Sequence, residues 1–365
     1  MAEIKTAVEQ TTANSEVQSG EVSPAEKTYS YFPGCSLTSS AGEYDVSFRL
    51  VADALGIQLD EIEDWNCCGA SPAPHHWGGN LGVLLPVRNL HHATHDSLVA
   101  PCVGCYNRMK NSQYEIANNE ELRSQAERVF GEPVRYETEV LNLVEFFARV
   151  ASPELLAERA QGRLEGLNLA TYYGCLMTRP AKIMNFDNVR NPVSMKPLLK
   201  ATGADAEHFP FKSECCGSYM GLARKEIVLR ASRRIIEVAD DMGFDAIITA
   251  CPLCHQNLDL RQGQINSTFG TNLEMPILYF SQVLGLALGI NADDLGVDSH
   301  MVSARRLLEK IARGPESNDG YVHGDPTPEK KDRSASTREK IGQDTGAPED
   351  SGQHTGITED KAGEE

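Results

Sequence analysis

The chain has 365 residues, of which 41% are hydrophobic and 24% are charged, and it carries a formal net charge of −18. This length is sufficient for two domains with separate cores, and the composition is ordinary for a soluble globular protein. The negative charge argues against nucleic acid or an anionic membrane surface as the natural partner.

Residues 1–27 are rich in Glu, Ser and Thr and show little periodicity, which predicts a disordered arm. They also lack the apolar centre of a secretory signal. The best candidate for a membrane span, Ile277–Ile290, is shorter than the roughly 20 apolar residues that a spanning helix needs. We therefore expect a cytoplasmic protein without a membrane span.

Residues 28–150 are expected to form a first α/β domain. β-branched and aromatic residues predict strands, and apolar residues at helical spacing predict helices. The predicted elements are, in order, a strand at Thr28–Phe32, a helix at Glu43–Leu55, a strand at Ile57–Ile62, a helix at Leu81–Leu98 and two helical segments within Asn107–Phe147.

A charged, helix-prone linker at 151–167 is expected to lead into a second domain at 168–313. Its predicted elements are a strand at Leu169–Tyr173, helices starting at Asn191 and spanning Leu222–Met242, strands at Asp245–Ala250 and Pro276–Phe280, and a helix at Val302–Ala312. Residues 314–365 are rich in Gly, Pro, Ser, Thr, Asp and Glu, which predicts a disordered acidic tail. The alternation of strands and helices in both halves predicts two similar α/β domains.

The cysteines form an internal repeat. Each half carries a single cysteine, then an adjacent pair followed by glycine, then a C-x-x-C. Matched positions lie 140, 148 and 149 residues apart (35 and 175, 67 and 215, 102 and 251), and all 10 cysteines are used. The first quintet is Cys35, Cys67, Cys68, Cys102 and Cys105, and the second quintet is Cys175, Cys215, Cys216, Cys251 and Cys254.

Three kinds of site could use these thiols. Five disulfides are disfavoured because we find no export signal and because adjacent cysteines suit disulfide pairing poorly. A structural zinc ion takes four ligands, usually from two pairs of C-x-x-C type, so five thiols overfill a zinc site. Soft thiolates in this number favour iron–sulfur chemistry. The pattern therefore predicts two iron–sulfur sites, with zinc as the alternative.

Each quintet resembles the CCG motif found in the B-type subunits of heterodisulfide reductase. The motifs read C-x31-C-C-G-x32-C-x-x-C from Cys35 and C-x39-C-C-G-x33-C-x-x-C from Cys175. The likeness extends to the flanking segments Tyr31–Cys35, Asp64–Ala70 and Tyr172–Cys175 and covers roughly residues 28–312. Two complete motifs make the resemblance specific.

The resemblance implies that each quintet binds a non-cubane [4Fe–4S] cluster through all five of its cysteines. It further implies that the two clusters face each other across the domain interface and that a disulfide substrate is cleaved between them. In that family the B-type protein works with a C-type iron–sulfur protein and an A-type flavin-bearing protein, so we expect similar partners. The resemblance says nothing about the arm or the tail.

Several other residues could assist this chemistry. Histidines near the motifs could supply protons, although the ordinary interpretation is that they lie at the surface or support the site: His75, His76, His91, His92, His95 and His255. Basic residues near the second quintet could bind a carboxylate or phosphate of a substrate, or could simply be solvated: Arg179, Lys182, Arg224 and Lys225. Trp65 next to the first pair would shield a cluster from water.

The sequence thus favours an oxidoreductase component that acts on a disulfide/thiol couple, with no catalytic residue assigned beyond the cluster ligands. The alternative is an electron-transfer component of a larger redox complex without its own disulfide chemistry. A zinc-stabilised interaction module is the third hypothesis.

Overall fold

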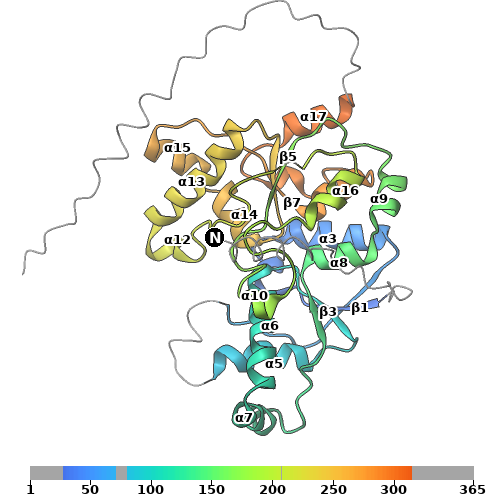
Figure 1. Cartoon of the computed structure of the whole chain (residues 1–365), viewed down its shortest axis with the longest axis vertical. Helices are drawn as coiled ribbons and strands as arrows, with labels where there is room; N and C mark the ends of the chain where they lie inside the picture. The colour runs from blue at the N-terminus through green and yellow to red at the C-terminus, as the bar shows by residue number, and fades with distance from the viewer. Residues whose placement is uncertain (1–27, 71–79, 207, 315–365) are drawn as a thin grey trace, which may run out of the picture. The chain divides into compact units, whose positions relative to one another are not determined.

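The computed structural model describes residues 28–70, 80–206 and 208–314. The predicted arm (1–27), the predicted tail beyond Gly314, and His75 and His76 lie outside these ranges. Within them, the strands form two parallel sheets that are surrounded by helices (Figure 1). This arrangement confirms the predicted α/β class.

The first sheet has the strand order β2-β1-β3-β4. Its strands are β1 (Thr28–Tyr31), β2 (Gln58–Glu61), β3 (Ser97–Val99) and β4 (Glu139–Leu141). In this sheet Tyr31 pairs with Glu61 of β2 and with Val99 of β3, and all the pairings are parallel. The carboxyl ends of the strands therefore meet at one edge, where open α/β sheets usually bind ligands.

The helices of this half are α2 (Gly34–Leu37), α3 (Gly42–Ala54), α5 (Leu81–His91), α6 (Val103–Ala117), α7 (Glu120–Phe130), α8 (Leu143–Val150) and α9 (Pro153–Ala160). The predicted helix at Leu81–Leu98 is wrong at its end, because α5 stops at His91 and Leu98 lies in β3. The predicted helical region Asn107–Phe147 likewise contains β4, which the sequence pattern did not indicate.

Asn142 caps α8 at the end of the first sheet. Its buried side chain accepts hydrogen bonds from the amides of Val144 (2.9 Å) and Glu145 (3.0 Å). The Glu145 carboxylate accepts the Asn142 amide in return at 3.0 Å, which completes a capping box. The cap fixes the direction in which the chain leaves β4.

Replacing Asn142 by alanine would leave these two amides without their acceptor inside the protein. We expect Asn142→Ala to lower the free energy of unfolding by about 1–2 kcal/mol, which would appear as a lower midpoint of urea unfolding. Asn119→Ala is the matched control, since Asn119 caps α7 through the Leu122 amide at 3.0 Å but is exposed to water. Asn119→Ala should lower the free energy of unfolding by about 0.5 kcal/mol. If the two variants lost equal stability, burial of the cap would not explain the effect of Asn142→Ala.

The second sheet has the order β5-β6-β7, and its strand residues are buried throughout. The strands are β5 (Leu169–Tyr172), β6 (Ala246–Thr249) and β7 (Ile277–Tyr279), again all parallel. A single bridge between Asn168 and Asp205 stands where the first sheet has β2. The second half thus repeats the strand order of the first half, except that an isolated bridge replaces the edge strand.

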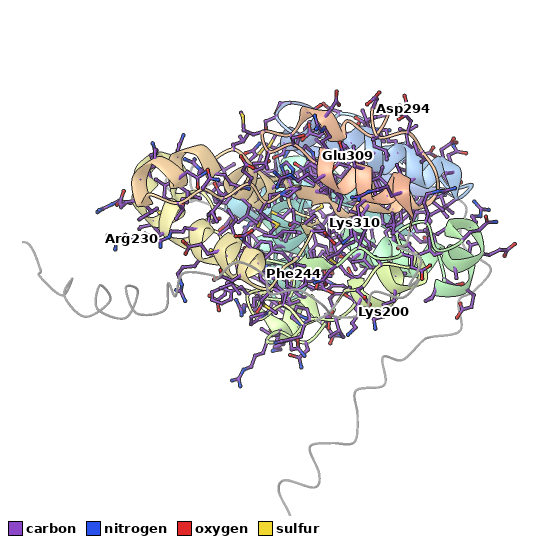
Figure 2. All side chains as sticks on the ribbon, turned by 90° about the horizontal axis from the view of Figure 1, so that it is seen from above. Lys200, Arg230, Phe244, Asp294, Glu309 and Lys310 are labelled. Atoms are coloured by element: carbon purple, nitrogen blue, oxygen red, sulfur yellow. The ribbon has the colours of Figure 1, made fainter. Side chains whose placement is uncertain are left out.

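The helices of the second half are α10 (Ala181–Met184), α11 (Met195–Ala201), α12 (Met220–Ala223), α13 (Lys225–Asp241), α14 (Pro252–Asp259), α15 (Gln262–Phe269), α16 (Phe280–Ala287), the 3-10 turn η1 (Val297–Ser299) and α17 (Arg305–Arg313). The predicted helix across Leu222–Met242 is confirmed from Lys225 onward in α13, which buries one apolar face, but its predicted start is wrong because the backbone of Arg224 is not helical and separates α12 from α13. Lys310 holds α17 to the start of β6 through Asp245 at 2.8 Å, and Figure 2 shows Lys310 on this helix.

The two halves contact each other through α3 and α8 of the first half and α16 of the second, and Figure 1 shows these three helices near one another. Ser47 of α3 and Ser281 of α16 share a buried hydrogen bond of 2.7 Å, and the rings of Phe147 and Phe280 lie 6.1 Å apart. The predicted domain boundaries at 150 and 168 remain a prediction. No helix in the described part of the chain is long and apolar enough to cross a bilayer.

Candidate metal centre

The first quintet gathers at the carboxyl ends of the strands of its sheet. Cys35 lies in α2 directly after β1, and Cys67 and Cys68 lie on the loop after β2. Cys102 is the N-cap of α6, and Cys105 lies in the first turn of that helix. The predicted arrangement of a C-x-x-C at a helix start is confirmed.

The five sulfurs of this quintet form a continuous series of contacts. The Sγ atoms of Cys35 and Cys67 lie 3.9 Å apart, and those of Cys68 and Cys105 lie 3.0 Å apart. Hydrogen bonds from Cys35 and then Cys68 lower the pKa of Cys67 to about 2. A hydrogen bond from Cys105 lowers the pKa of Cys102. Negative charge is therefore favoured on Cys67 and Cys102, whereas hydrogen bonds from neighbouring thiols and burial raise the pKa values of Cys35, Cys68 and Cys105. All five would have to lose their protons to ligate a metal.

The second quintet repeats this arrangement. Cys175 follows β5, and Cys251 is the N-cap of α14. The Sγ atoms of Cys216 and Cys254 lie 3.5 Å apart. Cys175 lowers the pKa of Cys215 to about 6 by hydrogen bonding, and Cys254 lowers the pKa of Cys216 to about 7 in the same way. Contacts link Cys175 with Cys215, and Cys254 with Cys216 and Cys251, and the two sets meet where Cys215 adjoins Cys216 in the chain.

Polar groups of the protein support the second quintet. The amide of Gly217 donates to Cys215 Sγ at 3.4 Å, and Asn257 Nδ2 donates to Cys216 Sγ at 3.4 Å. Asn257 also donates to the carbonyl of Ser218 at 3.0 Å, so it ties α14 to the loop that carries the cysteine pair. Sequence reasoning missed Asn257, although its position three residues after Cys254 puts both on one face of α14.

Two glycines leave space beside the sulfurs at matched positions. A Cβ on Gly34 would lie 3.2 Å from Cys105 Sγ, and a Cβ on Gly174 would lie 3.2 Å from Cys254 Sγ. Both glycines have a φ of 67°, which side chains rarely adopt. The residue before the first cysteine of each quintet is therefore restricted to glycine by both space and conformation.

The donor set fits a sulfur-ligated cluster better than a single ion. Among the residues that the structure describes, no group of three or more His, Cys, Asp or Glu side chains has a geometry that would hold one metal ion. Sulfur–sulfur contacts bring the cysteines of each quintet together. Most of the ten are buried, and three are exposed: Cys35, Cys67 and Cys215. Soft thiolates in such number suit iron–sulfur ligation.

A cavity of 70 Å³ lies where the two quintets approach each other. Its lining includes four cysteines of the second quintet, one of the first quintet and a tyrosine: Cys175, Cys216, Cys251, Cys254, Cys102 and Tyr219. Tyr219 extends from the second cysteine loop toward the first, because its hydroxyl lies 3.1 Å from where a Cβ on Gly104 would be. A molecule in this cavity would contact both quintets.

Among the predicted proton donors that the structure describes, no histidine lines this cavity. His255 is buried, its Nε2 lies 3.0 Å from the Ile277 carbonyl, and burial lowers its pKa well below the usual range. His91 is bonded to Glu132 at 2.9 Å, and His95 is bonded to Asp60 at 2.8 Å. These contacts favour supporting roles in the fold.

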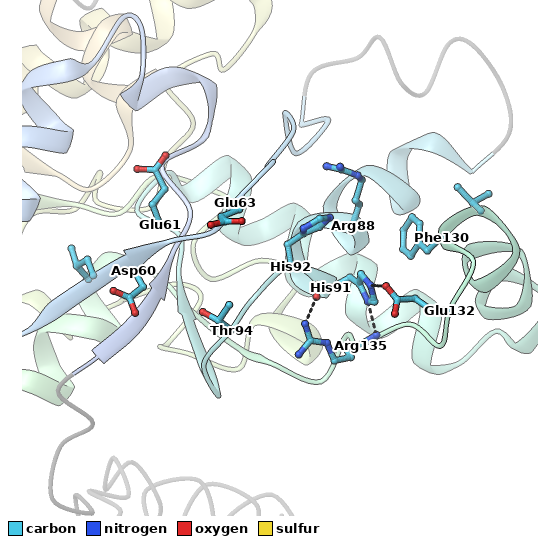
Figure 3. Close-up of a pocket in the computed structure, with 12 residues that line it drawn as sticks. Asp60, Glu61, Glu63, Arg88, His91, His92, Thr94, Phe130, Glu132 and Arg135 are labelled. Atoms are coloured by element: carbon cyan, nitrogen blue, oxygen red, sulfur yellow. Dashed lines mark hydrogen bonds and ion pairs between the residues drawn. The ribbon is translucent and has the colours of Figure 1, made fainter.

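His91 and His92 line a different cleft, of 980 Å³, in the first half (Figure 3). Figure 3 shows Arg88 and Arg135 beside these histidines, with Asp60, Glu61 and Glu63 on the other side of the cleft. Among the described residues that line this cleft there is no cysteine. This cleft is larger than the cavity beside the quintets, but its described lining offers no thiol, so we do not assign the redox site to it.

The predicted basic residues divide into two groups. Arg179 lies near the second quintet, where it donates to the Ser213 carbonyl at 3.2 Å and helps to lower the pKa of Cys215. Lys182 instead donates to the Tyr114 hydroxyl at 3.1 Å, while Arg224 and Lys225 are exposed. Trp65 packs edge-on against Phe32 at 5.6 Å, and its role as a shield for the first quintet stays a prediction.

Comparison with known proteins agrees with the repeat. The family model described as "CCG: Cysteine-rich domain" matches residues 29–110 and 169–259. The membrane anchor subunit of the 8-methylmenaquinol:fumarate reductase of Wolinella succinogenes is 31% identical over 287 residues, which cover 77% of this chain and 99% of the relative. The B-type subunit of the ferredoxin:CoB-CoM heterodisulfide reductase of Methanosarcina mazei is 28% identical over 289 residues, which cover 77% of this chain and 96% of that protein.

A solved structure, of a hypothetical protein from Helicobacter pylori, resembles the fold with a TM-score of 0.58 and 16% sequence identity. The match covers 76% of this chain and 52% of the other. At this level of identity the likeness concerns the fold alone.

Proposed function

The chain belongs to the family of cysteine-rich CCG proteins that includes the B-type subunits of heterodisulfide reductase, and we propose that it is the redox component of a multi-subunit complex with one iron–sulfur cluster in each quintet. Cys35, Cys67, Cys68, Cys102 and Cys105 would hold the first cluster, and Cys175, Cys215, Cys216, Cys251 and Cys254 would hold the second. Each quintet offers one thiol more than a cubane uses, which favours two non-cubane [4Fe–4S] clusters. When bound, each cluster would supply one electron at a time.

The proposed reaction is cleavage or formation of a disulfide in the cavity between the quintets. Reducing a disulfide to two thiols takes two electrons and two protons, one proton for each sulfur released. The observation that supports this proposal is the 70 Å³ cavity, because four cysteines of the second quintet line it and Cys102 of the first quintet reaches it from the other half. Two one-electron donors on opposite sides of one substrate would match that requirement.

The protein's own part is to hold the substrate and to limit water. Burial of Cys102, Cys216, Cys251 and Cys254 keeps the inner side of the cavity dry, while the exposed edge at Tyr219 leaves an opening. In dry surroundings, charge on sulfur is sensitive to nearby dipoles, such as the Asn257 amide beside Cys216. Protons would reach released thiolates from the open side, since His255 is enclosed.

A second candidate is electron transfer without disulfide chemistry. The 31% identity to the membrane anchor of an 8-methylmenaquinol:fumarate reductase favours it, because that relative is named for a quinol and fumarate couple. In both cases we expect a cytoplasmic location for this protein. We also expect partners that resemble the C-type iron–sulfur protein and the A-type flavin protein of heterodisulfide reductase.

The two candidates are separated by one assay of the complex purified without oxygen. The complex would be given reduced methyl viologen as the electron donor and offered the CoB–CoM heterodisulfide, cystine or glutathione disulfide. In parallel it would be assayed for quinol-dependent fumarate reduction. Thiol release from any one disulfide supports the first candidate. Fumarate reduction with no thiol release supports the second, and neither activity in a complex with full iron content would contradict both.

A further inference from the structure

One tyrosine touches both C-x-x-C turns. Tyr44 of α3 is fully buried, and its hydroxyl lies 2.9 Å from the carbonyl of Ala250 and 3.2 Å from the carbonyl of Pro101. Ala250 directly precedes Cys251, and Pro101 directly precedes Cys102. The same hydroxyl thus faces the entry of both cysteine turns.

These two carbonyls occupy matched positions of the repeat, 149 residues apart (101 and 250). Each is followed by the N-cap residue of a helix, Cys102 for α6 and Cys251 for α14. A phenol has one proton to donate, so the two acceptors share it in a three-centre hydrogen bond. Any movement that separates the turns must lengthen at least one branch of that bond.

The ring of Tyr44 is held in place from the second half. It stacks on Tyr279 with centroids 4.1 Å apart and planes inclined by 4°, and Tyr279 stacks on His255 at 4.2 Å. His255 follows Cys254, a member of the second quintet. Three residues further along α3, Ser47 bonds to Ser281 at 2.7 Å. Tyr44 therefore cannot turn away from the two carbonyls without breaking this packing.

We infer that Tyr44 is a positioning residue which fixes the two C-x-x-C turns relative to each other, and thereby sets the properties of both cysteine sites together. Without its hydroxyl, two buried carbonyls next to Cys102 and Cys251 lose their shared donor and the turns are free to relax. The electrostatic surroundings of both sites then change at once. This inference rests on the proposed function only in that each quintet holds a redox-active cluster.

The test is Tyr44→Phe in the intact complex, which removes the hydroxyl and keeps the ring stack. We expect both clusters to be retained and the midpoint potentials of both to shift in an electron paramagnetic resonance titration. Tyr31→Phe is the matched control, because Tyr31 is also buried in the first half but its hydroxyl donates to Asp45. The control should leave both potentials as in the wild type.

A shift of both potentials, or loss of iron from both quintets, in Tyr44→Phe but not in Tyr31→Phe supports the inference. A change confined to one cluster, no change at all, or the same change in both variants overturns it. Absence of iron from the wild-type complex would instead refute the proposed function, so the two failures are distinguishable.

Discussion

Cys216→Ala is expected to remove the second cluster and to leave the first in place, so that the protein retains about half of its iron. Cys216 is 3% exposed, and its sulfur lies 3.5 Å from Cys254 Sγ and accepts a hydrogen bond from Asn257. Alanine removes a thiolate from the centre of the group and leaves the Asn257 amide without that acceptor. Iron and acid-labile sulfide per chain, with electron paramagnetic resonance of the remaining cluster, are the measurements.

The repeat supplies the matched variant for this prediction. Cys68 is 2% exposed and lies 3.0 Å from Cys105 Sγ, so Cys68→Ala should give the mirror result, with loss of the first cluster and retention of the second. The two variants should then show different residual spectra. Loss of all iron in either variant would contradict independent sites.

Gly217→Ala should destabilise the protein severely. Gly217 has a φ of 98°, and a Cβ at this position would lie 2.7 Å from Val228 Cγ2 and 2.8 Å from Val228 Cα. Val228 is buried on α13, so neither atom can withdraw easily. Left-handed strain and overpacking together predict a cost of about 3 kcal/mol, seen as a lower thermal midpoint and reduced iron in the second site.

Gly243→Ala isolates the contribution of the contact with Val228. Gly243 also has a positive φ, of 71°, but a Cβ there would meet nothing within 4 Å. Only the conformational strain remains, so we expect a loss of about 1 kcal/mol and unchanged iron content. If both variants lowered the midpoint equally, close packing against Val228 would not explain the requirement for glycine.

Most elements of the fold could be predicted from sequence, including short strands in apolar or aromatic runs such as β5, β6 and β7, whereas β4 could not. The apolar face of α13 repeats over several turns and indicated its position. By contrast, β4 has three residues of which the first, Glu139, is exposed, so it lacks the continuous apolar run that marks the equally short β7. The end of α5 was placed too late because the apolar residues of β3 follow it closely and continue the helical spacing by coincidence.

The composition of the site was predictable from repeated spacing, whereas the residues that support it were not. The spacing grouped the ten cysteines, and the structure brings sulfurs of each quintet into contact. Tyr44 reaches the cysteine turns only because α3 packs against α16, which no local pattern indicates. His255 looked suited to proton transfer because it adjoins Cys254, but its burial depends on the ring of Tyr279 from another strand.

The most direct test of the account is the metal content of the complex purified without oxygen. Elemental analysis with Mössbauer spectroscopy should find about eight iron atoms per chain, in two clusters that differ from cubanes. Bound zinc with no iron or labile sulfide would contradict the assignment of both quintets.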